Sequence, residues 1–217
     1  MEHLRRELDL RPGRTVLDLA AGTGKLTRLL AETGARAIAV EPLRGMRAVL
    51  EEVVPAAEAL AGTAEAIPLD DESVDAVTVA QAFHWFDLER AYREVARVVR
   101  PGGALAVVWN SRDPGDALQH AITAILEPLR EPSVPHVWDS PVRPELFSEW
   151  ETWEHRWAEE YDRDLLRTRI RSVSFVAALP EAEQRRVLDE VEAAAAGLPE
   201  RFPFPYVTEI FICRRHP

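Results

Sequence analysis

Cysteine and lysine are almost missing from this 217-residue sequence, and long apolar runs are missing altogether. The one cysteine, Cys213, excludes a disulfide framework and any metal site built from cysteines alone. No apolar run reaches the roughly 18 residues that a membrane-spanning helix needs, and the first residues do not resemble a secretory signal peptide. We therefore expect a cytoplasmic protein that does not cross a membrane.

Positive charge is also scarce, with 26 basic residues against 37 acidic ones and a formal net charge of −11. Lys25 is the single lysine, and no run of basic residues is present. Such a chain repels a phosphate backbone, so we expect no nucleic-acid partner. The composition, 47% hydrophobic and 29% charged, is that of an ordinary globular domain with enough apolar mass for a core.

Two hydrophobic periods alternate through the first half of the chain. Short apolar runs predict strands at residues 16–20, 35–40, 57–61, 74–80 and 104–109. Segments with helical spacing lie between them, including a helix that Pro42 opens and one over residues 88–99. Strands that alternate with helices through short connections predict a parallel sheet with right-handed crossovers.

The second half has a different pattern. Helices are predicted at residues 117–129, 165–178 and 181–196, and strands at 152–161 and 206–213. Five prolines between residues 128 and 144 predict an extended loop, because proline at that density prevents regular helix. No linker separates the halves, so we expect one domain over residues 1–217.

A glycine-containing loop follows the first predicted strand, with the pattern Asp18-x-Ala20-x-Gly22-x-Gly24. Glycines there let the backbone approach a ligand closely, and the next helix offers unpaired N–H groups. Glu41 ends the second predicted strand, 19 residues after Gly22. Its carboxylate can accept hydrogen bonds from two neighbouring ribose hydroxyls, so the pattern indicates a nucleoside-containing cofactor.

Two other nucleotide-binding motifs fit this loop less well. A dinucleotide fingerprint places a third glycine where this chain has Thr27. A phosphate-binding Walker loop needs serine or threonine after Lys25, and Leu26 cannot bind magnesium. A nicotinamide-dependent NAD(P) oxidoreductase remains an alternative, as does a cofactor-binding protein without catalysis.

The loop resembles motif I of the class I S-adenosylmethionine-dependent methyltransferases, in the type 11 branch that acts on small molecules. Glu41-Pro42 and residues 62–65, 74–86 and 97–105 resemble further family segments, in the family's order and spacing. One departure is Ala20, which replaces the first glycine of the usual pattern. The resemblance implies a Rossmann-like α/β fold: a seven-stranded, mostly parallel sheet with helices on both faces and an antiparallel last strand.

The same resemblance implies S-adenosyl-L-methionine as cofactor and a set of residues that hold it. The acid before the glycines would hold the methionine part, Glu41 the ribose, and Met46 and the segment after the third strand the adenine. The implied cofactor-binding residues are Asp18, Ala20, Gly22, Gly24, Glu41, Pro42, Met46, Thr63, Ala64, Glu65 and Gln81. We expect residues 1–110 to form this cofactor half and residues 111–217 to shape the acceptor site.

His84 is the candidate catalytic residue. It follows the fourth predicted strand, at the sheet edge where open α/β folds bind ligands. A neutral imidazole can take the acceptor's proton as the methyl group arrives; the alternative is a structural hydrogen bond beneath an aromatic wall. Candidate acceptor-pocket residues are Trp85, Phe86, Trp109, His136 and Trp138.

The reaction that the resemblance implies is in-line displacement at the sulfonium methyl, for which the protein supplies proximity, alignment and a dry site. The fourth strand is not followed by the Asn/Asp-Pro-Pro-Tyr pattern of certain nitrogen methyltransferases. Methylation of cytosine at C5 needs a nucleophilic cysteine, and the one cysteine, Cys213, is distant in sequence from the glycine-containing loop. With the acidic charge, these observations favour a small-molecule acceptor methylated at oxygen, nitrogen or carbon.

Overall fold

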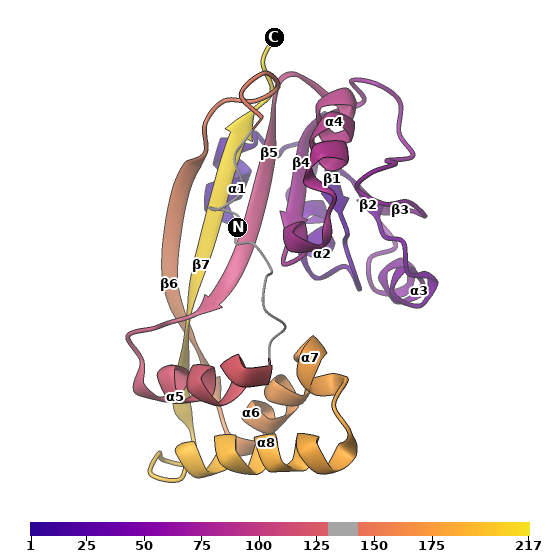
Figure 1. The fold of residues 1–217 in the computed structure, drawn as a ribbon. Coiled ribbons are helices and arrows are strands. Elements are labelled where there is room, and N and C mark those ends of the chain that lie inside the picture. Colours follow the sequence, from indigo (N-terminus) through magenta and orange to yellow (C-terminus); the bar gives the residue numbers. More distant parts are fainter. Residues whose placement is uncertain (130–142) are drawn as a thin grey trace. The chain divides into compact units, whose positions relative to one another are not determined.

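The computed structural model describes residues 1–129 and 143–217. Within them, seven strands form one sheet in the order β3-β2-β1-β4-β5-β7-β6 (Figure 1). The strands are β1 (Thr15–Leu19), β2 (Arg36–Val40), β3 (Glu58–Leu60), β4 (Val74–Ala80), β5 (Val99–Arg112), β6 (Glu151–Tyr161) and β7 (Phe202–Arg214). The first five are parallel, and β7 is antiparallel to β5 and β6. The expected fold is confirmed.

Eight α-helices and two short 3-10 helices accompany these strands in the described residues. They are α1 (Glu2–Glu7), α2 (Lys25–Ala31), α3 (Arg44–Val53), η1 (Phe83–Trp85), α4 (Leu88–Val98), α5 (Ala117–Leu126), η2 (Glu127–Leu129), α6 (Arg163–Arg171), α7 (Ser174–Ala177) and α8 (Glu181–Ala194). No helix in the described part of the chain is long and apolar enough to span a membrane.

Several elements differ from the sequence predictions; strand β7, for example, begins at Phe202, four residues before its predicted start. The helix predicted over 165–178 is two helices, because Ser172 Oγ donates to the Arg169 carbonyl (2.7 Å) and ends α6. Helix α3 begins two residues after Pro42. Strand β5 begins at Val99, five residues before its predicted start, because Gly102 N and Gly103 O both bond to the backbone of Arg215 (3.0 and 2.8 Å).

The described chain divides into two compact units, each with a core of its own. The first comprises residues 1–109, 143–153 and 210–217, and the second residues 110–129 and 154–209. Strands β5, β6 and β7 contribute residues to both units. In the second unit, apolar residues of α5, α6 and α8 pack with Phe202, Phe204 and Tyr206 of β7.

Helices cover both faces of the sheet in the first unit. Successive residues of β1 point to opposite faces, so Val16 packs with Leu4 of α1 and Leu30 of α2, whereas Leu17 lies in the cluster that includes Tyr92 of α4. Strands buried on both faces need continuous apolar runs, which explains why β1, β2 and β4 were predictable. Polar residues that follow these strands then collect at the carboxyl edge of the sheet.

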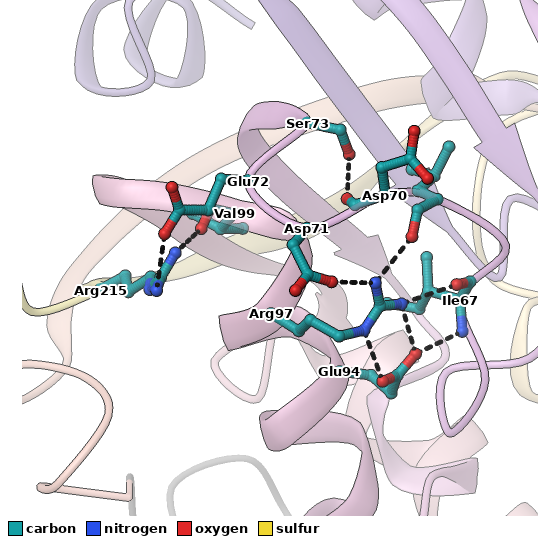
Figure 2. Close-up of polar contacts among 10 residues, drawn as sticks. Ile67, Asp70, Asp71, Glu72, Ser73, Glu94, Arg97, Val99 and Arg215 are labelled. Atoms are coloured by element: carbon teal, nitrogen blue, oxygen red, sulfur yellow. Dashed lines mark hydrogen bonds and ion pairs between the residues drawn. The ribbon is translucent and has the colours of Figure 1, made fainter.

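Arg97 of α4 fastens the loop between β3 and β4 (Figure 2). Its guanidinium donates to the carbonyls of Ile67 (2.9 Å) and Leu69 (2.7 Å), to Asp71 (2.8 Å) and to both oxygens of Glu94 (2.8 Å each). All five N–H groups are therefore used. The hydrogen bonds that Arg97 donates to the Glu94 and Asp71 carboxylates raise the pKa of Arg97.

We expect Arg97→Met to lower the free energy of unfolding by about 2–4 kcal/mol, because two carbonyls and a partly buried carboxylate lose their donor together. Urea unfolding measures the change. Arg93→Met is the matched control on the same helix: Arg93 is 72% exposed and pairs with Glu89, so its loss should cost less than about 0.5 kcal/mol. Equal effects of the two substitutions would contradict the role of Arg97.

Candidate active site

The loop between β1 and α2 turns sharply through left-handed backbone conformations. Ala20, Gly22 and Gly24 have φ angles of 57°, 58° and 83°. A glycine adopts such angles freely, whereas Ala20 does so at some cost in energy. Gly24 is also the N-cap of α2, and a Cβ there would lie 3.0 Å from the side chain of Leu50 in α3. The glycines therefore let the chain turn and let α3 approach.

Glu41 ties this loop to the end of β2. Its side chain is buried (4% exposed), and Oε2 accepts a hydrogen bond from Gly22 N while Oε1 accepts one from Leu43 N, both at 2.9 Å. Each carboxylate oxygen has a second lone pair, so both oxygens can still accept a hydroxyl. The residue thus both shapes the loop and offers the acceptors that a ribose diol needs.

Asp18 lies beneath the loop, with 1% of its surface exposed. Its carboxylate accepts hydrogen bonds from Thr27 Oγ1 of α2 (2.6 Å) and Thr78 Oγ1 of β4 (3.4 Å). Burial raises its pKa to about 7, since the low-dielectric interior disfavours the charged form. The sequence did not identify either threonine as a site residue; Thr27 only argued against a dinucleotide fingerprint.

The candidate adenine contacts lie in two segments. Pro42 lies two residues before α3 and Met46 in its first turn, and both are exposed; Met46 is 43% exposed and thus not a core residue. In the loop after β3, Thr63 is exposed and Ala64 is buried. Glu65 there accepts a hydrogen bond from Asp87 N at 3.0 Å.

The residues after β4 gather at the same edge. Gln81 has a φ of 60° and its N–H donates to the Val108 carbonyl (3.0 Å). The ring of half-buried His84 lies with its centroid 4.5 Å from Trp85 and 5.1 Å from Trp109 of β5. Trp85 is 68% exposed. The structure thus brings His84 and two candidate acceptor-pocket residues together.

Three further candidates complete the comparison with the sequence. Phe86 is half-buried and packs against Phe83, with centroids 5.8 Å apart. His136 and Trp138 lie outside the described residues, so the structure does not test their place in an acceptor pocket.

Comparison with known proteins agrees with this geometry. Residues 17–107 match the methyltransferase domain family. The chain is 42% identical over 200 residues to an uncharacterized methyltransferase of Mycobacterium tuberculosis (strain H37Rv), covering 90% of this chain and 81% of that protein. The solved structure of a protein described as a type II methyltransferase from Anaeromyxobacter dehalogenans superposes with a TM-score of 0.74 at 28% identity, covering 100% of this chain and 95% of that one.

A further relative matches about half of the chain. A demethylmenaquinone methyltransferase of Corynebacterium urealyticum is 44% identical over 105 residues, which are 48% of this chain and 44% of that protein. Together, fold, loop and relatives show that the chain belongs to the class I S-adenosylmethionine-dependent methyltransferases. It is an enzyme of that class, which decides against the oxidoreductase and the non-catalytic binding protein.

Proposed function

We propose that this protein transfers the methyl group of S-adenosylmethionine to oxygen, nitrogen or carbon of a small-molecule acceptor. The observation that carries the proposal is the buried Glu41 carboxylate, bonded to Gly22 of the loop. The net charge of −11 supports an acceptor other than a nucleic acid. The name of the Corynebacterium relative, a demethylmenaquinone methyltransferase, supports a small molecule.

The cofactor would lie over the loop of Ala20, Gly22 and Gly24. Glu41 would bind the ribose, with Pro42 and Met46 beside the adenine and Thr63 and Ala64 at its edge. Asp18 would act on the methionine part through the loop, since its carboxylate holds Thr27 at the start of α2. Gln81 would face the methionine end from the carboxyl terminus of β4. The cofactor supplies the electrophilic methyl group; the chain's residues orient it and exclude water.

His84 would accept the proton of a neutral acceptor at one imidazole nitrogen as the new bond to carbon forms. Trp85, Phe86 and Trp109 would line the acceptor site. An acceptor that is already a carboxylate would need no base.

Calorimetry of the full chain with S-adenosylhomocysteine tests the cofactor assignment. We expect a dissociation constant on the order of micromolar and no binding of NADH. Transfer of labelled methyl from S-adenosylmethionine to a metabolite extract tests catalysis, and His84→Gln should slow it about 100-fold while cofactor affinity stays unchanged. Absence of S-adenosylhomocysteine binding would overturn the proposed function; an undiminished rate would overturn only the role of His84.

A further inference from the structure

The loop between β3 and β4 has two differently anchored halves. Residues 67–73 are held by Arg97 and Glu94, and Glu94 also accepts a hydrogen bond from Ile67 N at 2.8 Å (Figure 2). Residues 61–66 carry the proposed adenine contacts. A Cβ at Gly62 would lie 2.6 Å from Pro68 Cδ, and Ala64 is 4% exposed. Close packing at Gly62 and Ala64 therefore leaves residues 61–66 little room to move when a ligand binds against them.

Glu65 joins this half to the segment that carries the candidate base. Its Oε1 accepts a hydrogen bond from Asp87 N at 3.0 Å. Asp87 is in turn the N-cap of α4, where its Oδ1 accepts from Arg90 N at 3.3 Å. Asp87 stands two residues after Trp85 and three after His84, so the Glu65 bond lies at the exit of η1.

The entrance of η1 is anchored separately, by Phe83. That side chain is 3% exposed, and its ring lies against Tyr92 (centroids 5.9 Å apart) and Trp150 (6.4 Å). Trp85, by contrast, is 68% exposed and has little packing to hold it. The course of η1 is thus set by the core packing of Phe83 and Phe86 and, just beyond its end, by the hydrogen bond between Asp87 N and Glu65.

We propose that Glu65 is a positioning residue that couples the cofactor to the acceptor wall, here His84 and Trp85. Binding of the cofactor against Thr63 and Ala64 restricts the motion of Glu65. The hydrogen bond from Asp87 N to Glu65 then stays formed and fixes the backbone at the end of η1. Glu65 acts through the backbone of Asp87 and does not itself contact the adenine, unlike the role that family resemblance implied. The inference rests on the proposed function, because it needs the cofactor on this loop.

Two substitutions separate a positioning role from a cofactor ligand. Glu65→Gln keeps an oxygen that can accept from Asp87 N, whereas Glu65→Met has similar length and no such acceptor. We expect both variants to bind S-adenosylhomocysteine within about threefold of the wild-type affinity. In the wild type and in Glu65→Gln, S-adenosylhomocysteine should slow amide hydrogen exchange at Trp85 and Asp87 about tenfold; in Glu65→Met it should not.

The outcomes are distinguishable. A Glu65→Met variant that binds S-adenosylhomocysteine more than about tenfold more weakly would make Glu65 a cofactor ligand and overturn the proposal. Equal protection in all three proteins would overturn it as well. If the methionine variant does not fold, the wild type decides: unchanged exchange at Asp87 on adding S-adenosylhomocysteine contradicts the coupling. Failure of the wild type to bind at all would overturn the proposed function itself.

Discussion

Replacing Glu41 by alanine is expected to weaken binding of S-adenosylhomocysteine by at least about 100-fold. Hydrogen bonds to a charged group contribute about 1.5–3 kcal/mol each, and a ribose diol would lose two of them. The substitution also removes the acceptor of Gly22 N and Leu43 N, so the loop loses its tie to β2. Calorimetry at constant pH and salt measures the change.

Two further variants test whether the loss of affinity is specific to the carboxylate of Glu41. Glu41→Gln offers one carbonyl oxygen where two backbone N–H groups now point, so its amide nitrogen would face a donor and binding should weaken by roughly tenfold or more. Glu58→Ala is the matched control, because Glu58 lies on neighbouring β3, is exposed and pairs with Arg36 at 2.6 Å. Its affinity should stay near that of the wild type. An unchanged affinity in Glu41→Ala would remove the central support for the cofactor site.

Stability is expected to depend on pH through Asp18. Its folded pKa of about 7 lies above the ordinary unfolded value of about 3.9, so the folded state holds the proton more tightly. The resulting stability is fully present below the unfolded pKa and is lost as pH rises through 7. From pH 5 to pH 8 this group should lower the free energy of unfolding by about 2–3 kcal/mol.

Asp18→Asn isolates this contribution. An amide at this position stays neutral and can still accept a hydrogen bond from Thr27 Oγ1. The free energy of unfolding of the variant minus that of the wild type should therefore be about 2–3 kcal/mol larger at pH 8 than at pH 5. Urea unfolding at the two pH values measures it. Asp189→Asn, at a side chain 71% exposed, should show a difference that does not vary with pH. If the difference in stability between Asp18→Asn and the wild type also did not vary with pH, that would contradict a raised pKa of Asp18.

The parts of the fold that could be predicted are those that local pattern specifies. Strands β1, β2 and β4 are continuous apolar runs because both of their faces are covered. The start of β5 was not predictable, since Pro101, Gly102 and Gly103 are residues that stop a helix. The hydrogen bonds that draw them into a strand come from Arg215, at the far end of the chain.

The site shows the same division. The glycines, Glu41 and His84 could be proposed because each follows a recognisable strand at a spacing that a cofactor requires. Thr27, Thr78 and Arg97 could not, since a threonine in a helix or a strand, or an arginine among many others, carries no local signal of its partner. Glu65 was proposed as a cofactor contact, but its hydrogen bond with Asp87 N, 22 residues away, has no local signal either.

The sequence alone therefore indicated the succession of strands and helices along the chain, because apolar period is a local property. Its motifs, through their resemblance to a known family, indicated the methyltransferase class. The tertiary structure decided what each acid bonds. Asp18 meets Thr27 and Thr78 across 9 and 60 residues, Glu41 meets Gly22 across 19, and Glu65 meets Asp87 across 22. These partners come within hydrogen-bond distance only when the parallel strands align and bring their carboxyl ends to one edge.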